Sequence, residues 1–150
     1  MVHVTRTFTV ARPPEVVVSY LADFGNAEQW DPGTQSCTRV DPGPVQVGAT
    51  WHNVSRVLGM TSDLTYRLDR LESERVVLLG HNDRVDSVDD ITVRPHPDGS
   101  EVVYDATITF RGLAKLGSPV MQLEFEHLGN RTVTGIQEAV AQLPDGPDGP

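Results

Sequence analysis

The sequence predicts an α+β fold in which a seven-stranded antiparallel sheet curves around one long C-terminal helix. Two observations indicate it: short alternating segments separated by turn residues fill the first 110 residues, and an apolar stripe at helical spacing follows them. No helical pattern separates the last six strand segments, which excludes a parallel sheet with crossover helices. A helix with a single apolar face needs a broad partner, so we expect a cavity between sheet and helix.

The C-terminal helix is predicted over residues 119–143. Ser118-Pro119 is typical of a helix start, because serine caps the first turn and proline there loses no hydrogen bond. Two internal glycines, Gly129 and Gly135, each cost about 1 kcal/mol relative to alanine. Gly129 either leaves room for a ligand or a close strand, or marks a bend in the helix. The stripe consists of Met121, Phe125, Leu128, Thr132, Ile136, Ala139 and Leu143.

The N-terminal residues predict one strand and two short helices. Residues His3 to Val10 alternate as a half-buried strand, with Arg6 in the apolar phase. Arg6 is either a strand-end arginine that reaches water or a cation at the mouth of the cavity. Pro14 begins the first helix, and Ala27 to Trp30 form a second, short helical turn. Asp31, in the turn that follows, is interpreted as a turn former.

Six further strands are predicted between residues 36 and 110. They span residues 36–40, 49–58, 61–71, 76–81, 86–94 and 101–110. The strongest turn is Pro95-His96-Pro97-Asp98-Gly99, and another lies at Gly59-Met60. The strand over 49–58 has two possible phases, and the pattern does not choose between them. Either Trp51, Asn53, Ser55 and Val57 face the interior, or His52, Val54, Arg56 and Leu58 do.

Length, charge and cysteine content narrow the class of protein. The 150 residues fit a single domain over 1–143, followed by a Pro/Asp/Gly tail over 144–150 that we expect to be disordered. A net charge of −9 argues against binding to nucleic acid or anionic membranes. No membrane-spanning run and no signal peptide is visible, and the single cysteine, Cys37, fits a reducing compartment. We therefore expect a cytoplasmic protein, a monomer or a homodimer.

The ordered set of elements and short motifs resembles the START-like or Bet v 1-like (SRPBCC) superfamily of helix-grip proteins. Within it, the chain looks most like the bacterial polyketide cyclase/dehydrase and lipid-transport group. The resemblance rests on Pro13 to Val17, Tyr20 to Asp23, Trp30 to Pro32, Gly48 to Trp51, Arg111 to Leu113 and the terminal helix. It implies a sheet that grips the last helix around a cavity for hydrophobic or aromatic small molecules. The superfamily has no universal catalytic signature, so the resemblance implies no catalytic residue here.

Ten residues on the expected cavity side or rim are predicted to contact a ligand: Trp30, Trp51, Tyr66, His81, Asp89, Tyr104, Phe110, Met121, Phe125 and Leu128. Tyr66 and Tyr104 either hydrogen-bond a ligand or are core tyrosines. His81 is either a general base or a histidine at the rim beside a turn. Asp89 shares its phase with apolar neighbours, so it is a costly buried carboxyl unless a bulge turns it outward. Trp30 either covers the cavity or fixes the short helix to the sheet.

Two functions are consistent with these observations. The first is the binding of a hydrophobic or aromatic small molecule, as a carrier or a sensor. The alternative is a polyketide cyclase or dehydratase-type enzyme, which requires titratable groups that converge, such as His81 with Asp89 or Arg56. No phosphate-binding loop or zinc-ligand spacing is present, and Cys37 has no base nearby in the sequence, so we expect no cofactor and no metal. The acidic run from Asp83 to Asp90 is interpreted as a solvated edge.

Overall fold

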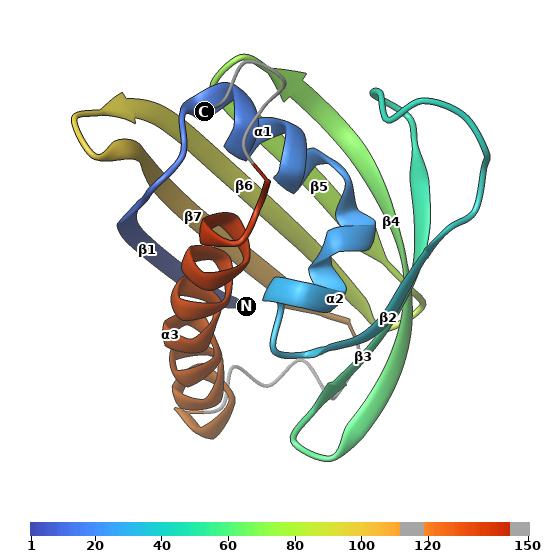
Figure 1. The fold of residues 1–150 in the computed structure, drawn as a ribbon. Coiled ribbons are helices and arrows are strands. Elements are labelled where there is room, and N and C mark those ends of the chain that lie inside the picture. The colour runs from blue at the N-terminus through green and yellow to red at the C-terminus, as the bar shows by residue number, and fades with distance from the viewer. Residues whose placement is uncertain (112–118, 145–150) are drawn as a thin grey trace.

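The computed structural model describes residues 1–111 and 119–144. Seven strands form one antiparallel sheet in the order β1-β7-β6-β5-β4-β3-β2 (Figure 1). The predicted cap Ser118 and the tail over 145–150 lie outside the described residues. The strands are β1 (Val2–Val10), β2 (Thr34–Arg39), β3 (Thr50–Val57), β4 (Met60–Glu72), β5 (Arg75–His81), β6 (Val85–His96) and β7 (Gly99–Phe110). The helices are α1 (Pro14–Ala22), the 3-10 turn η1 (Phe24–Asn26), α2 (Ala27–Trp30) and α3 (Pro119–Ala141).

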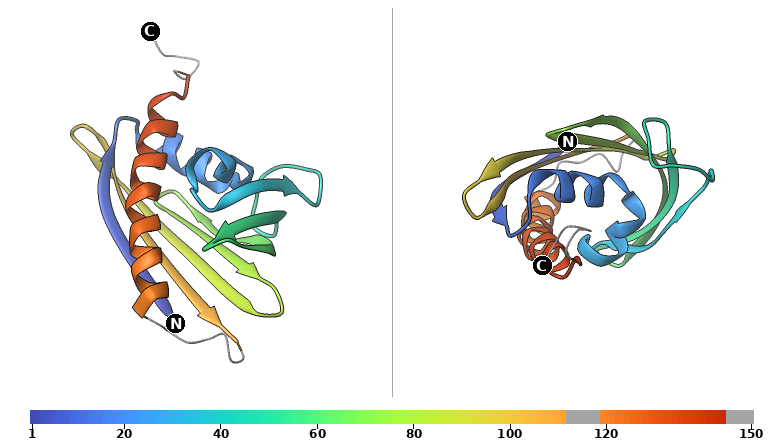
Figure 2. Two further views of the ribbon diagram at one scale, coloured as in Figure 1. Left: turned by 90° about the horizontal axis from the view of Figure 1, so that it is seen from below. Right: turned by 45° about the horizontal axis from the view of Figure 1, so that its top comes forward.

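All the helices lie on the concave side of the sheet. Figure 2 shows the sheet curving around α3 on one side and around α1, η1 and α2 on the other. The predicted helix-grip architecture is confirmed, with the long helix after the last strand and the short helices between β1 and β2. None of the helices within residues 1–111 and 119–144 is long and apolar enough to cross a membrane.

Two hairpin turns are tighter than the sequence predicted. Strand β6 continues through Pro95, which pairs with Ser100 near the strand end, so the turn itself is only Pro97-Asp98. The β3–β4 turn is Leu58-Gly59, and both residues have left-handed backbone angles, with φ of 52° and 77°. This mirror-image turn matches the twist of the two strands, but it places a leucine where glycine or asparagine is favoured.

Burial along β3 decides the phase that the sequence left open. Trp51 and Asn53 are completely buried and face the helices, whereas His52 and Arg56 are exposed on the outer face. The core then assembles around Phe24 of η1, whose ring centroid lies 4.4 Å from that of Tyr66 and 6.3 Å from that of Trp51. The short N-terminal helices therefore contribute the centre of the aromatic core.

Helix α3 is held at two points by glycines that allow close approach. A Cβ at Gly129 would lie 2.7 Å from Val4 Cγ1, and a Cβ at Gly135 would lie 2.3 Å from the carbonyl oxygen of Trp30. The Arg6 guanidinium adds a polar anchor, because it donates to the backbone and carboxylate of Glu126 and to the side chain of Asn130. Gly129 therefore serves a close strand, and Arg6 neither reaches water freely nor lines the cavity described below.

The apolar stripe of α3 is buried unevenly along its length. Thr132 and Ile136 in the C-terminal half are buried in the core, as is Val140, which the predicted stripe did not include, whereas the stripe residue Ala139 is only partly buried. Phe125 and Leu128 in the N-terminal half are only partly buried, although they continue the same face. This half of the helix faces an internal cavity.

Candidate functional site

The cavity lies between the N-terminal half of α3 and the concave face of the sheet, and it has two connected lobes. The apolar lobe has a volume of about 110 Å³ and is lined by Ser55, Val57, Met60, Ser62, Leu64, Tyr66, Val85, Ser87, Ile108, Phe110, Met121 and Phe125. The carboxyl lobe has a volume of about 80 Å³ and is lined by Val2, Val4, Asp31, Gly33, Val57, Tyr66, Ser87, Asp89, Tyr104, Ala106, Ile108, Phe125, Leu128, Gly129 and Thr132. Five residues line both lobes, so one elongated molecule can occupy the two together.

Asp89 of β6 is the most deeply buried carboxyl of the cavity, with 5% of its surface exposed. It lies between Ile91 and Ser87 on the inward face, and the register with β5 and β7 runs through it without a bulge. Burial, and secondarily the nearby Asp31 carboxylate, raises the pKa of Asp89 to about 8. Asp89 therefore carries its proton at neutral pH and presents a carboxylic acid to the cavity.

Asp31 provides the second carboxyl, from the turn between α2 and β2. Its carboxylate accepts hydrogen bonds from the Gly33 amide at 3.1 Å and from the Thr34 hydroxyl at 2.8 Å. Burial raises its pKa, while these two hydrogen bonds stabilise the charged form and oppose the shift. Asp31 is a turn former, as predicted, and it also lines the carboxyl lobe.

Two tyrosines complete the polar part of the cavity. The Tyr104 hydroxyl is the hydrogen-bonding neighbour of the Asp89 carboxyl, and the Tyr66 hydroxyl donates to Ser87 Oγ at 3.3 Å. Burial, and then the negative charge of Asp89, raises the pKa of both phenols well above the usual value near 10. Both side chains are therefore neutral at physiological pH, and each can donate or accept a hydrogen bond.

A glycine sets the position of Tyr66. Gly80 of β5 is the direct partner of Tyr66 in the sheet, and a Cβ at position 80 would lie 2.5 Å from Tyr66 Cζ. The phenol ring therefore lies flat over the backbone of β5 and reaches Ser87 on the next strand. A glycine inside a strand is the sequence signal for such a close approach.

Seven of the ten predicted contact residues line the cavity: Tyr66, Asp89, Tyr104, Phe110, Met121, Phe125 and Leu128. Trp30 and Trp51 line neither lobe. Trp30 packs edge-on behind Tyr104 at a centroid distance of 6.2 Å, and Trp51 is completely buried with the Arg39 guanidinium 5.4 Å from its ring. Both tryptophans are buried, so they pack behind the cavity wall rather than line it.

The prediction for His81 is wrong, because the strand phase was assigned in the opposite sense. Val76, Leu78 and Gly80 face the core, so His81 lies on the outer face, with 66% of its side chain exposed. Its Nδ1 lies 2.7 Å from Asp86 Oδ1. Arg56 is also exposed, so the predicted pairing of His81 with Asp89 or with Arg56 does not form in the cavity.

The acidic run on β6 divides between the two faces of the strand. Asp86 interacts with His81 and Arg111, and Asp90 makes a bidentate pair with Arg75 at 3.0 and 2.7 Å, all on the outer face. Asp89 alone turns inward. Within residues 1–111 and 119–144, no group of three or more His, Cys, Asp and Glu side chains is placed to hold a metal ion.

Sequence reasoning missed the role of Asp31 in the cavity. The motif Trp30-Asp31-Pro32-Gly33 predicts a turn, and nothing in the local pattern says that this turn approaches β6. It also missed Ser87, whose inward position follows from the phase of Asp89. Cys37 is buried beside acidic groups, and burial raises its thiol pKa to about 11, so it is not a nucleophile.

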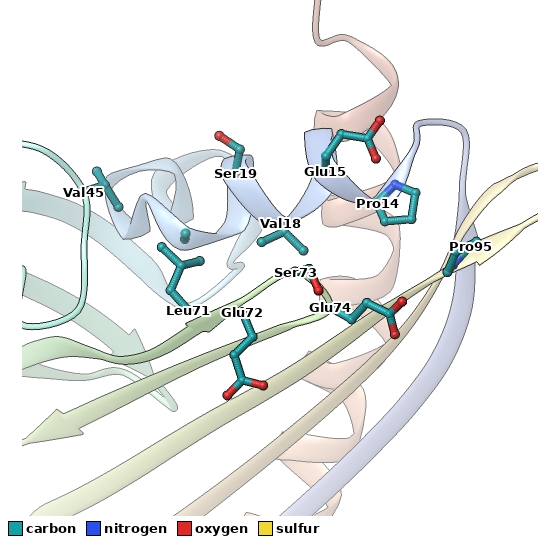
Figure 3. A pocket seen from close by; sticks show the side chains of 11 residues that line it. Pro14, Glu15, Val18, Ser19, Val45, Leu71, Glu72, Ser73, Glu74 and Pro95 are labelled. Carbon is teal, nitrogen blue, oxygen red and sulfur yellow. The ribbon is translucent and has the colours of Figure 1, made fainter.

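A larger groove of about 570 Å³ lies elsewhere, between α1 and the β4–β5 turn. Figure 3 shows Val18 of α1 and Leu71 of β4 on its two sides, with Glu15, Glu72 and Glu74 around them. It shares no lining residue with the two lobes, and it is open to solvent. Ligand sites bury most of a small molecule, so the two-lobed cavity, which is less open to solvent than this groove, is the candidate site.

Comparison with known proteins agrees with this architecture. A profile of the family described as "Polyketide cyclase / dehydrase and lipid transport" matches residues 1–143. The chain belongs to this family. No curated protein sequence matches the chain significantly.

Solved structures share the fold of this polyketide cyclase/dehydrase and lipid transport family member at low sequence identity. A START superfamily protein from Mycobacterium smegmatis is 16% identical with a TM-score of 0.78, over 95% of this chain and 99% of that one. The ZhuI aromatase/cyclase from Streptomyces sp. R1128 is 19% identical with a TM-score of 0.70, over 92% and 90%. A protein from Thermus thermophilus is 18% identical with a TM-score of 0.69, over 93% and 96%. These likenesses show the fold, and the chemistry of the cavity must be argued from its own residues.

Proposed function

We propose that this protein binds a compact hydrophobic or aromatic molecule that carries one polar group, as a carrier or a sensor. The observation that supports the proposal is the division of the cavity. The apolar lobe takes the hydrocarbon part against Phe110, Met121 and Phe125, and the carboxyl lobe takes the polar group against Asp89 and Tyr104. A mostly apolar cavity with a few convergent polar groups is the usual form of a small-molecule site.

The size of the cavity limits the ligand. The lobes have volumes of about 110 and about 80 Å³, which fit one aromatic ring or two fused rings with a short substituent rather than a long acyl chain. The partly buried face of α3 is consistent with this function, because a bound ligand would cover Phe125 and Leu128.

A cavity-filling variant tests the proposal. Phe125→Trp adds bulk between the two lobes and should abolish binding of 2-naphthol, a neutral fluorescent probe of about the right size, while the protein stays folded. The matched control is Leu123→Trp on the same helix, where 72% of the leucine is exposed. Binding is measured by fluorescence titration and folding by thermal denaturation. Equal affinity in both variants and the parent would refute the site, and unfolding of Phe125→Trp alone would make Phe125 a core residue.

Native mass spectrometry provides a second, independent measurement. The freshly purified protein is compared with a denatured sample of the same batch. A discrete extra mass that is lost on denaturation would identify the chemical class of a bound molecule. A clean ligand-free mass would exclude a tightly held ligand.

An enzyme of the cyclase or dehydratase type is the second candidate, and the convergence of Asp89 with Asp31 favours it. A protonated acid beside a second carboxyl that accepts two hydrogen bonds is a suitable pair for moving a proton to and from a carbonyl substrate. The test is turnover of an aromatic polyketide-like substrate by the parent and by Asp89→Asn and Asp31→Asn. Equal product formation in all three would eliminate this candidate.

A further inference from the structure

We propose that the carboxyl lobe receives the ammonium group of its ligand, so that the bound molecule is a compact amine with an aromatic or aliphatic body. The inference rests on the binding function proposed above and specifies the charge of the ligand. It follows from a missing countercharge, from the space beside the two carboxyls and from the donors that an ammonium group carries.

The missing countercharge is the first observation. A buried carboxyl such as Asp89, with a second carboxyl lining the same lobe, is costly unless a positive charge lies near it. No lysine, arginine or histidine is among the residues that line either lobe, within the part of the chain that the structure describes. Arg6 of β1, two strands away from β6 in the sheet, is already held by Glu126 and Asn130 of α3. Without a cation beside it, Asp89 keeps its proton.

The space beside the carboxyls is the second observation. The walls of the carboxyl lobe on β1 and α3 offer no titratable group, because they consist of Val2, Val4, Phe125, Leu128, Gly129 and Thr132. The groups that face Asp89 from the other elements are Asp31, Tyr66 and Tyr104. The wall of the carboxyl lobe therefore carries carboxyl and phenol oxygens on one side and apolar side chains on the other.

An ammonium group matches this arrangement. Its three N–H donors can be shared among the Asp31 and Asp89 carboxylates and the Tyr104 hydroxyl. The attached ring or chain extends into the apolar lobe, and the aromatic faces there attract a nearby cation. A metal ion is a poorer match, because hard cations take six or more oxygen ligands and the rest of the lobe is apolar.

The alternatives are disfavoured by charge. A carboxylate ligand would bring a negative charge beside Asp31 and the protonated Asp89 with no cation to offset it, in a protein whose net charge is already −9. A neutral alcohol would hydrogen-bond the protonated Asp89 without offsetting any charge. An ammonium ion enters as R–NH₃⁺, Asp89 loses its proton to the buffer, and the buried site ends with two carboxylates and one cation.

The test is a series of three ligands with the same phenyl body: 2-phenylethylamine, 2-phenylethanol and phenylacetate. We expect the amine to bind at least about tenfold more tightly than the alcohol at pH 7, because a charge-assisted hydrogen bond in a buried site is worth more than a neutral one. Phenylacetate should not bind. Calorimetry in two buffers of different ionisation enthalpy should detect the release of nearly one proton per amine bound, since the pKa of Asp89 is about 8.

Two variants test whether the amine preference and the proton release arise from the carboxyl lobe. Asp89→Asn should lose at least about tenfold in amine affinity and all of the proton release, with a much smaller loss of alcohol affinity, because the amide still offers a neutral hydrogen bond. Asp90→Asn is the matched control, because Asp90 is the next residue on β6 and pairs with Arg75 on the outer face. An alcohol that binds as tightly as the amine, or amine binding without proton release, would overturn the inference and leave the proposed function intact. Failure of all three ligands and of 2-naphthol would overturn both.

Discussion

The phenol ring of Tyr66 lies on the bare Cα of Gly80, so closely that a Cβ there would meet three ring atoms at 2.5 to 2.9 Å. This contact places the Tyr66 hydroxyl beside Ser87, at the boundary between the two lobes. The shape of the cavity therefore depends on the absence of one methyl group on β5.

Gly80→Ala tests this dependence. The added methyl group should displace the Tyr66 ring and lower the free energy of unfolding by about 1–3 kcal/mol, the usual cost of an overpacked core. Urea denaturation measures the change. The control is the same substitution in a Tyr66→Ala background, where the collision cannot occur and the cost should largely disappear. An equal cost in both backgrounds would show that the glycine is needed for another reason.

Asp89 should make the stability of the protein depend on pH. Its pKa is about 8 in the folded protein against an ordinary value of 3.8, so between these values the folded state holds a proton that the unfolded state has lost. The free energy of unfolding should therefore fall as pH rises from about 4 to 8, with a contribution of up to about 1.4 kcal/mol per pH unit, and level off above pH 8.

Asp89→Asn should flatten this profile, because the amide does not titrate. Chemical denaturation at pH 5, 6, 7 and 8 gives the profiles of the parent, of Asp89→Asn and of Asp90→Asn. If the two variants flatten the profile equally, burial of Asp89 is not the cause.

Leu58→Gly should stabilise the protein. Leu58 has a left-handed backbone angle, with φ of 52°, and its side chain is 48% exposed, so little packing is lost. Removing the steric cost of that angle outweighs the extra flexibility of glycine, for a net gain of about 0.5–1 kcal/mol. Thermal denaturation measures it. Gly59→Ala in the same turn, where φ is 77°, should have the opposite sign; a loss in both variants would argue against backbone strain.

The fold could be predicted because its determinants are local. The alternation of strand residues and the three-four spacing from Phe125 to Ile136 reflect which face of each element is buried. The inward position of Asp89 could be predicted for the same reason, since it shares the phase of Ile91. The prediction for His81 failed because β5 is apolar on both faces. Val77, which points to the outer face, is as apolar and nearly as buried as Val76 and Leu78 on the inner face. In such a strand the sequence does not show which residues face the core.

The site could be predicted less well, because its chemistry is made by contacts between distant segments. Asp31 and Asp89 lie far apart in the sequence, on a turn and on a central strand, and only the curvature of the sheet brings both to one lobe. Trp30 and Trp51 were candidate ligand contacts because the pattern cannot distinguish a wall residue from one packed behind the wall. Such distinctions depend on tertiary packing.

The attachment of α3 to β1 has a consequence for how the protein is made. The partner of β1 in the sheet is β7, and Arg6 bonds to Glu126 and Asn130 of α3, more than a hundred residues later. A nascent chain therefore exposes β1 long before the ribosome delivers either partner, and contacts of such long range also slow folding. Residues of β1 and of α3 both line the carboxyl lobe, so the cavity cannot hold a ligand until α3 has been synthesised.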